Sequence, residues 1–141
     1  MKFLLIISLV GFVVIGCQSA PTVQTDSGVP NVAAEIKDVS PVEAQAAVSK
    51  AYSQFIDVRT PEEYAAGHAE RARNIPLDTL AANLDRIERN EPVYVICQTG
   101  RRSRQAAELL KQRGFNNVLN VTGGTAAWTA AGLPTTTVAV Q

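Results

Sequence analysis

Short apolar segments alternate with helix-start signals along most of this 141-residue chain. The segments that read as buried strands are 36–39, 54–58, 92–96 and 117–121, with a brief extended piece at 74–76. Helices are expected over 41–50, 61–66, 78–89 and 103–113, followed by a last short helix that opens at Gly123-Gly124. Strands that alternate with helices favour a parallel sheet covered on both faces. We therefore expect an α/β fold with an open parallel sheet flanked by helices.

Two of the expected helices begin with the same local pattern. Ser40-Pro41-Val42-Glu43 and Thr60-Pro61-Glu62-Glu63 each read as a capping box with proline at the first helical position. The two glutamates of the second box are expected to serve the helix cap and dipole rather than acid–base chemistry. For 78–89 the prediction depends on spacing, because Leu77, Leu80, Leu84 and Ile87 recur at helical intervals.

The N-terminal segment indicates export. Lys2 precedes an apolar run from Phe3 to Ile15 that is shorter than the roughly 20 residues needed to span a bilayer. Residues 1–16 are therefore predicted to be a signal peptide. Val14-Ile15-Gly16-Cys17 resembles the lipobox of bacterial lipoproteins, which implies cleavage before Cys17 and a lipid on its thiol. An ordinary secretory signal, or an uncleaved anchor with Cys17 incidental, is the alternative.

The rest of the chain then divides into three parts. Residues 17–34 form the lipidated cysteine and a flexible linker, 35–134 form the folded domain, and 135–141 form a tail. The first residues of the tail, Thr135 to Thr137, are either a solvated end or one extra edge strand. The lipoprotein resemblance implies a location in the cell envelope. Because Gln18 is not Asp, that location is the outer membrane facing the periplasm if the cell has one, and otherwise the outer face of the cytoplasmic membrane.

Composition excludes several kinds of site. The chain has two cysteines, so once Cys17 is acylated Cys97 has no disulfide partner within it. A lone thiol in an oxidising compartment is a candidate reactive group. One histidine and one remaining cysteine are too few for a zinc site, and no metal is expected. A net charge of zero without a basic stripe argues against a nucleic-acid partner.

Cys97 occupies the position where chemistry is expected. It follows the 92–96 strand, and ligands of open α/β sheets bind at the carboxyl ends of the strands. It also precedes a helix, whose unpaired N–H groups favour an anion, while Arg101 and Arg102 add positive charge. Gly100 permits the positive φ that a tight loop needs. We expect a thiolate that is largely ionised at neutral pH, and that can take up a sulfane sulfur as a persulfide cradled by the loop amides.

The motifs resemble those of the rhodanese family. Cys97 to Ser103 resembles the family's active-site loop, C-x-x-G-x-R-S. The other matching segments are Asp57 to Tyr64, Gly67-His68, Asn74-Ile75-Pro76, Gly114-Phe115, Gly123-Gly124, Trp128 and Gly132-Leu133-Pro134. They occur in family order over about residues 36–134, and the arrangement is similar to single-domain rhodaneses, including exported ones of the phage-shock type.

The resemblance implies a thiosulfate sulfurtransferase or persulfide carrier that needs no cofactor and acts as a monomeric domain. The donor is thiosulfate or a persulfide, and the acceptor is cyanide or a thiol. Cys97 matches the nucleophile, and Arg102 matches a position that often contacts the anionic donor. The loop that binds substrate and persulfide is Gln98, Thr99, Gly100, Arg101, Arg102 and Ser103.

Other positions are expected to be structural. Asp57 and Arg59 support the site, His68 is a hydrogen-bonded residue at a turn, and Trp128 belongs to the core. Ala69 and Arg71 stand where the family usually has Ile and Gly, and we expect some local rearrangement there.

Two other functions remain open. The domain is either an enzyme or a binding module that relays a persulfide or oxidised sulfur to a partner at the envelope, with little turnover of small molecules. A Cys-based phosphatase or arsenate reductase would use C-x5-R, a loop one residue longer. The sixth position after Cys97 is Ser103, and the arginine comes one residue early, so the loop length favours sulfur transfer.

Overall fold

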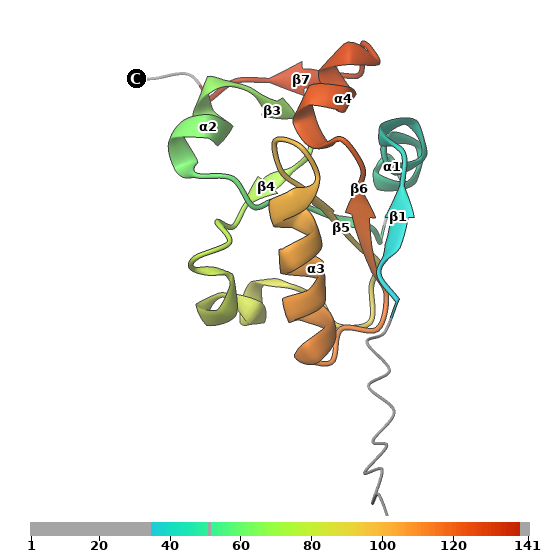
Figure 1. Ribbon diagram of the computed structural model, residues 1–141, viewed down its shortest axis with the longest axis vertical. Helices are drawn as coiled ribbons and strands as arrows, with labels where there is room; N and C mark the ends of the chain where they lie inside the picture. The colour runs from blue at the N-terminus through green and yellow to red at the C-terminus, as the bar shows by residue number, and fades with distance from the viewer. Residues whose placement is uncertain (1–34, 51, 139–141) are drawn as a thin grey trace, which may run out of the picture. The chain divides into compact units, whose positions relative to one another are not determined.

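The centre of the molecule is a five-stranded, wholly parallel sheet. The computed structural model describes residues 35–50 and 52–138. The sheet has the strand order β1-β6-β5-β2-β4 (Figure 1). Its strands are β1 (Lys37–Val39), β2 (Gln54–Asp57), β4 (Arg73–Asn74), β5 (Val93–Ile96) and β6 (Val118–Val121). The α/β class and the parallel sheet are confirmed.

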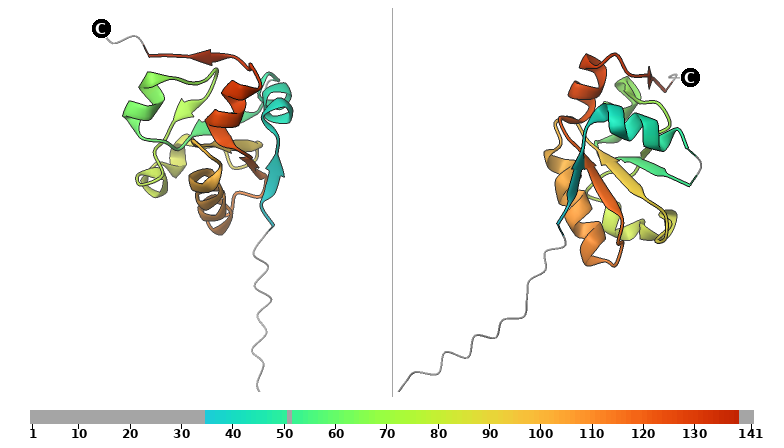
Figure 2. Two further views of the ribbon diagram at one scale, coloured as in Figure 1. Left: turned by 45° about the horizontal axis from the view of Figure 1, so that its top comes forward. Right: turned by 90° about the vertical axis from the view of Figure 1, so that its right-hand side faces the viewer.

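Helices cover both faces of this sheet. The α-helices are α1 (Pro41–Val48), α2 (Pro61–Ala66), α3 (Arg101–Gln112) and α4 (Gly124–Ala130). Figure 2 shows α3 on one face and α1 with α4 on the other. Successive strand residues point to opposite faces of the sheet and so belong to two separate hydrophobic cores. In β2, Ile56 packs on the α3 side and Phe55 packs on the side of α1 and α4. Trp128 is fully buried in the second core, 5.2 Å from the Phe55 ring.

Both capping boxes form as predicted. The Ser40 hydroxyl accepts from the Glu43 N–H at 3.3 Å, and the Ser40 N–H donates to the Glu43 carboxylate at 2.8 Å. Thr60 and Glu63 repeat the arrangement, with distances of 3.3 and 3.0 Å. These local contacts start α1 and α2 at the prolines, which fixes where α2 stands at the carboxyl edge of the sheet.

The predicted amphipathic helix over 78–89 is wrong. The segment instead forms two 3-10 turns, η1 (Leu80–Ala82) and η2 (Leu84–Arg86). Asn83 interrupts the run, and its side-chain amide donates to the Thr79 carbonyl at 2.8 Å, which competes with regular helix bonding. Leu80 and Ile87 are buried against the α3 side of the sheet. The leucine spacing therefore indicates which side chains are buried, and it does not indicate a continuous helix.

The end of the described chain returns to the domain. β3 (His68–Ala69) and β7 (Thr135–Thr136) form a separate antiparallel pair. Of the two alternatives for the tail, the extra edge strand is the one found. His68 lies in this pair as a structural residue, because its ring stacks on Tyr64 at 3.6 Å and its Nδ1 is 2.9 Å from the Tyr64 carbonyl.

Of the two departures from the family pattern, Ala69 ends β3 and Arg71 lies in the turn that follows. Ala69 is fully buried, while Arg71 is exposed and has a φ of 70°. That left-handed conformation costs a non-glycine residue energy, which is the physical reason for a glycine at such a position. The turn thus accommodates Arg71 as a strained residue, and its guanidinium reaches the Ser49 carbonyl at 3.3 Å.

The N-terminal predictions concern another part of the chain. The signal peptide over 1–16, lipidated Cys17 and the 17–34 linker all lie outside the described residues. Within 35–50 and 52–138, no helix is both long and apolar enough to cross a membrane.

Candidate active site

The Cys97 loop lies at the carboxyl edge of the sheet, between α2 and α4 (Figure 1). Cys97 directly follows β5, and α3 begins at Arg101, two residues before the predicted start. Gly100 is the N-cap and has a φ of 93°. A Cβ at that position would lie 3.2 Å from the Gly123 nitrogen, so glycine suits both the conformation and the space.

The Cys97 sulfur is enclosed by hydrogen-bond donors. The Gly100 N–H donates to Sγ at 3.1 Å, and the Ser103 hydroxyl oxygen lies 3.4 Å from it. Burial, with only 1% of the residue exposed, by itself raises the pKa of the thiol. Hydrogen bonds that the charged form of the sulfur accepts from Ser103 and from the amides of Thr99 and Gly100 outweigh burial, so the pKa of Cys97 is lowered. The geometry therefore favours a sulfur anion here.

The loop backbone is fixed by the start of α4. The Thr125 N–H and hydroxyl both donate to the Cys97 carbonyl, at 2.7 and 3.1 Å, and the Ala126 N–H donates to the Gln98 carbonyl at 3.1 Å. A Cβ on Gly124 would lie 2.2 Å from the Cys97 carbonyl oxygen. The sequence indicated Gly123-Gly124 only as a helix start, whereas the structure makes Gly124 the point of contact between α4 and the loop.

Asp57 and Arg59 form a buried ion pair beside the loop. The Arg59 guanidinium lies 2.7 Å from the Asp57 carboxylate, and the side chains are 4% and 0% exposed. The same guanidinium donates to the Gly67 carbonyl at 2.7 Å and to the Gln98 side chain at 3.3 Å. The pair thus ties the end of α2 to the loop, in keeping with the supporting role expected for both residues.

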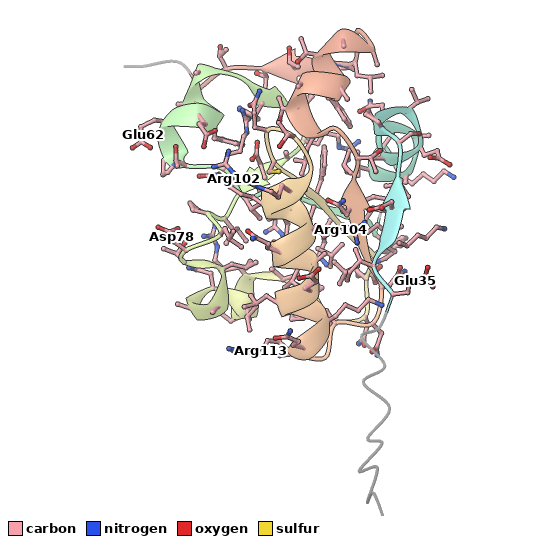
Figure 3. All side chains as sticks on the ribbon, in the orientation of Figure 1. Glu35, Glu62, Asp78, Arg102, Arg104 and Arg113 are labelled. Atoms are coloured by element: carbon pink, nitrogen blue, oxygen red, sulfur yellow. The ribbon has the colours of Figure 1, made fainter. Side chains whose placement is uncertain are left out.

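Arg102 is engaged by Glu63, for which the sequence predicted only a capping role. Its guanidinium makes two hydrogen bonds of 2.7 Å with the Glu63 carboxylate, and in Figure 3 it lies on the side of α3 that faces α2. The hydrogen bond from Arg102 holds the pKa of Glu63 at about 2. The predicted anion ligand is therefore neutralised by Glu63, while Arg101 is exposed. Because the capping box already accounted for Glu63, the sequence offered no reason to expect its contact with Arg102.

Two pockets border the Glu63–Arg102 pair, one on the Glu63 side and one on the Arg102 side. One, of about 340 Å³, is lined by Arg59, Glu63, Ala66, Gly67, Gln98 and Thr125. The other, of about 490 Å³, is mostly apolar and is lined by Val58, Thr60, Pro61, Pro76, Leu77, Asp78, Thr79 and Arg102. Glu63 borders the first cavity and Arg102 the second, so the ion pair stands between them. Among the described residues, no group of three or more His, Cys, Asp or Glu side chains is placed to hold a metal ion.

Comparison with known proteins identifies the family. Residues 40–131 match the model of the rhodanese-like domain. The chain belongs to the rhodanese-like family. Its relatives include a sulfurtransferase of Allochromatium vinosum, which is 38% identical over 80 residues that cover 57% of this chain and 75% of the relative.

Further relatives extend the rhodanese assignment. The thiosulfate sulfurtransferase GlpE of Actinobacillus pleuropneumoniae is 33% identical over 97 residues, 69% of this chain and 90% of the relative. The crystal structure of a rhodanese-like domain protein from Staphylococcus aureus superposes with a TM-score of 0.62 at 36% identity, covering 66% of this chain and 91% of that one. The predicted family and fold are confirmed, and the named relatives support sulfurtransferase chemistry at the level of the rhodanese family.

Proposed function

We propose that this rhodanese domain is a sulfurtransferase that moves a sulfane sulfur from thiosulfate or a persulfide donor to cyanide or a thiol. The observation that carries the proposal is the environment of Cys97, whose sulfur receives an N–H from Gly100 at 3.1 Å inside a loop of amides. Such an environment stabilises a thiolate before transfer and a persulfide after it. Relatives named as sulfurtransferases support the same chemistry.

The reaction divides into two displacements at sulfur. The Cys97 thiolate attacks the outer sulfur of thiosulfate, the S–S bond of the donor breaks, and sulfite leaves with the electron pair. Cys97 then carries a persulfide, whose terminal sulfur holds the negative charge. Cyanide or an acceptor thiolate attacks that terminal sulfur, the new S–S bond breaks, and its electron pair returns to Cys97. The products are thiocyanate or an acceptor persulfide, and the Cys97 thiolate is restored.

A persulfide or redox relay to a partner protein is the second candidate. It is favoured by the Glu63–Arg102 contact, because an arginine already neutralised by a carboxylate attracts a small dianion such as thiosulfate less strongly. A relay would accept a sulfane sulfur from a partner's persulfide, which leaves as a thiolate, and pass it to another partner thiol with little turnover of small molecules.

One assay on the full-length protein separates the enzyme from the relay. Thiocyanate formation from thiosulfate and cyanide is measured beside a Cys97→Ser control, and Cys97 is examined by mass spectrometry after exposure to thiosulfate. Turnover above the control supports the enzyme. Addition of one sulfur atom that persists without turnover supports the relay, and absence of both effects contradicts the proposal that Cys97 carries sulfur.

Loop geometry argues against the phosphatase and arsenate reductase alternatives. Ser103, the sixth residue after Cys97, is fully buried and contacts the sulfur, so no arginine is available at the position that a C-x5-R loop needs. Hydrolysis of an aryl phosphate that disappears in Cys97→Ala would revive the phosphatase alternative.

We also propose that the protein is exported and held at the cell envelope by a lipid on Cys17. This proposal is supported by the Val14-Ile15-Gly16-Cys17 resemblance and by the apolar segment that precedes it. In that setting the domain works in an oxidising compartment, where Cys97 has no disulfide partner within the chain.

A further inference from the structure

A chain of side-chain contacts runs from the Cys97 sulfur through the sheet to its edge. Ser103 on α3 lies 3.4 Å from Sγ and 2.6 Å from the side-chain oxygen of Asn120 on β6. The Asn120 amide nitrogen donates to the Asp38 carboxylate on β1 at 2.8 Å, and Arg104 pairs with that carboxylate. Ser103 and Asn120 are 0% and 3% exposed, so solvent does not compete for the inner contacts.

The Ser103 hydroxyl has one hydrogen and two acceptors. An amide oxygen only accepts, so at 2.6 Å the hydrogen of Ser103 points to Asn120. Ser103 then turns a lone pair toward the Cys97 sulfur, at the longer distance of 3.4 Å. A neutral thiol tolerates that arrangement because it can donate its own hydrogen to Ser103. A sulfur anion is disfavoured by this arrangement, because it has no hydrogen to donate and can only accept the hydrogen of Ser103.

Asp38 determines which end of the Asn120 amide faces Ser103. A carboxylate only accepts hydrogen bonds, so it requires the amide nitrogen of Asn120 and leaves the amide oxygen for Ser103. Arg104 holds the carboxylate in place, and Figure 3 shows Arg104 on the side of α3 that faces β1. Reversing the Asn120 amide would bring its oxygen against the Asp38 carboxylate, so the orientation is locked.

We propose that Asn120 and Asp38 are positioning residues that keep the Ser103 hydrogen directed at Asn120 as long as the Cys97 sulfur is a neutral thiol. A sulfur anion at Cys97 has to take the Ser103 hydrogen from Asn120. This arrangement thus disfavours ionisation of the neutral Cys97 thiol. Once the sulfur carries charge, the Ser103 hydroxyl rotates and donates its hydrogen to the sulfur. The role of Asn120 and Asp38 in catalysis rests on the proposed sulfur transfer, whereas their effect on the pKa of Cys97 does not.

The half-buried and buried charged groups around the loop occur as pairs that the test leaves intact, while Arg101 in the loop and Glu62 on α2 are exposed and unchanged in every variant. Arg59 pairs with Asp57 and Arg102 pairs with Glu63. The remaining elements packed around the loop, β5, β6 and α4, contribute Tyr94 as their only titratable side chain. On β1 the neighbour of Asp38 is Lys37, which is exposed.

The test measures the pKa of Cys97 through the pH dependence of its alkylation by iodoacetamide, read by mass spectrometry of the Cys97 peptide in the full-length protein. Asn120→Val removes the competing acceptor, and we expect the pKa to fall by about one unit. Asp38→Asn lets the Asn120 amide reverse, and a fall of roughly half a unit is expected. Asp38 is a partly exposed side chain, so this second variant keeps the test informative if Asn120→Val folds poorly.

A double-mutant cycle separates orientation from simple loss of charge. Each variant is repeated in a Ser103→Ala background, where no hydroxyl remains to be positioned. We expect the effect of Asn120→Val to disappear there and that of Asp38→Asn to shrink to the small shift given by Glu108→Gln, which removes an exposed carboxylate of α3. Equal shifts with and without Ser103, or no shift in either variant, would overturn the proposal. Alkylation requires no sulfur transfer, so a negative thiocyanate assay leaves this result interpretable.

Discussion

Cys97 combines near-complete burial with a lowered pKa, two properties that normally oppose each other. Burial in an apolar site raises the pKa of a thiol, and here donors from the loop and from Ser103 reverse that effect. The charged form of the sulfur is thus stabilised by protein donors rather than by water. Its chemistry depends on the few donors that reach it.

Replacing Ser103 by Ala tests this dependence. The variant removes a donor to the charged form, so the pKa of Cys97 should rise by roughly half a unit to one unit. The thiolate is the active form, and activity falls as the pH drops below the pKa of Cys97. The acidic limb of the kcat/KM profile should therefore move to higher pH by the same amount. A profile that loses amplitude without moving would mean that Ser103 acts only on loop structure.

Glu63→Gln tests whether the Glu63–Arg102 pair limits the use of an anionic donor. Glutamine at this position can keep the capping box of α2 but no longer neutralises Arg102. We expect kcat/KM for thiosulfate to rise by about 3- to 10-fold, since an exposed ion pair of this kind corresponds to about 1 kcal/mol. Steady-state kinetics with thiosulfate, beside a thiol persulfide donor as the control, measures it. An equal change with both donors would show that the pair does not select for charge.

At the scale of elements, the start of α4 packs directly against the backbone of the Cys97 loop. A methyl group on Gly124 would meet the Cys97 carbonyl oxygen at 2.2 Å and the backbone of Gln98 at 2.6 Å. Neither partner is a side chain that can rotate away. The helix or the loop has to move instead, and with it the amides that surround the sulfur.

Gly124→Ala should therefore lower kcat/KM by about 100-fold and destabilise the fold by about 2 kcal/mol or more. Gly132→Ala is the matched control, because Gly132 also has a left-handed φ of 67° but nothing within 4 Å of its would-be Cβ. That control should lose about 1 kcal/mol of stability and keep its activity. Thermal unfolding and the thiocyanate assay on both variants measure the contrast, and equal losses of activity would contradict this account of the junction.

Arg71→Gly addresses the strained turn after β3. Glycine adopts a φ of 70° without steric cost, and the hydrogen bond that is lost, to the Ser49 carbonyl, is exposed. We expect the free energy of unfolding to increase by about 0.5 kcal/mol, because the entropy of glycine in the unfolded chain offsets part of the gain. Denaturant unfolding measures it. A destabilised variant would mean that the Arg71 contact outweighs the backbone strain.

Some elements could be predicted from sequence because their causes are local. The capping boxes depend on residues three apart, and α1 and α2 begin where those boxes predict. The 78–89 segment could not be predicted correctly, since leucine spacing reports which residues are buried and not which backbone bonds form. Glu63–Arg102 and Ser103–Asn120 join residues 39 and 17 positions apart, and no local pattern marks either pair. The loop around Cys97 could thus be predicted, whereas the contacts that Glu63 and Asn120 make with it could not.

For the molecule as a whole, the envelope proposal makes a separate prediction. Replacing Cys17 by Ala removes the thiol that would carry the lipid, and we expect the protein to leave the membrane fraction. Fractionation of cells that express either form, followed by immunoblotting, measures it. The thiocyanate activity of the released protein serves as the control for folding, and a Cys17→Ala variant that stays in the membrane fraction would show that lipidation is not the anchor.

The residues that enclose the Cys97 loop come from distant parts of the chain. Asp38 lies on β1, near the start of the described residues, and Thr125 and Ala126 lie close to their end. While the chain is being synthesised or exported, Cys97 emerges before α4 exists to hold its carbonyl. Until α4 docks, Cys97 is an unprotected thiol with ordinary reactivity, able to form mixed disulfides with passing thiols. Under the envelope proposal, oxidation of Cys97 is therefore a risk mainly before folding is complete, and docking of α4, the last described helix along the chain, ends that exposure.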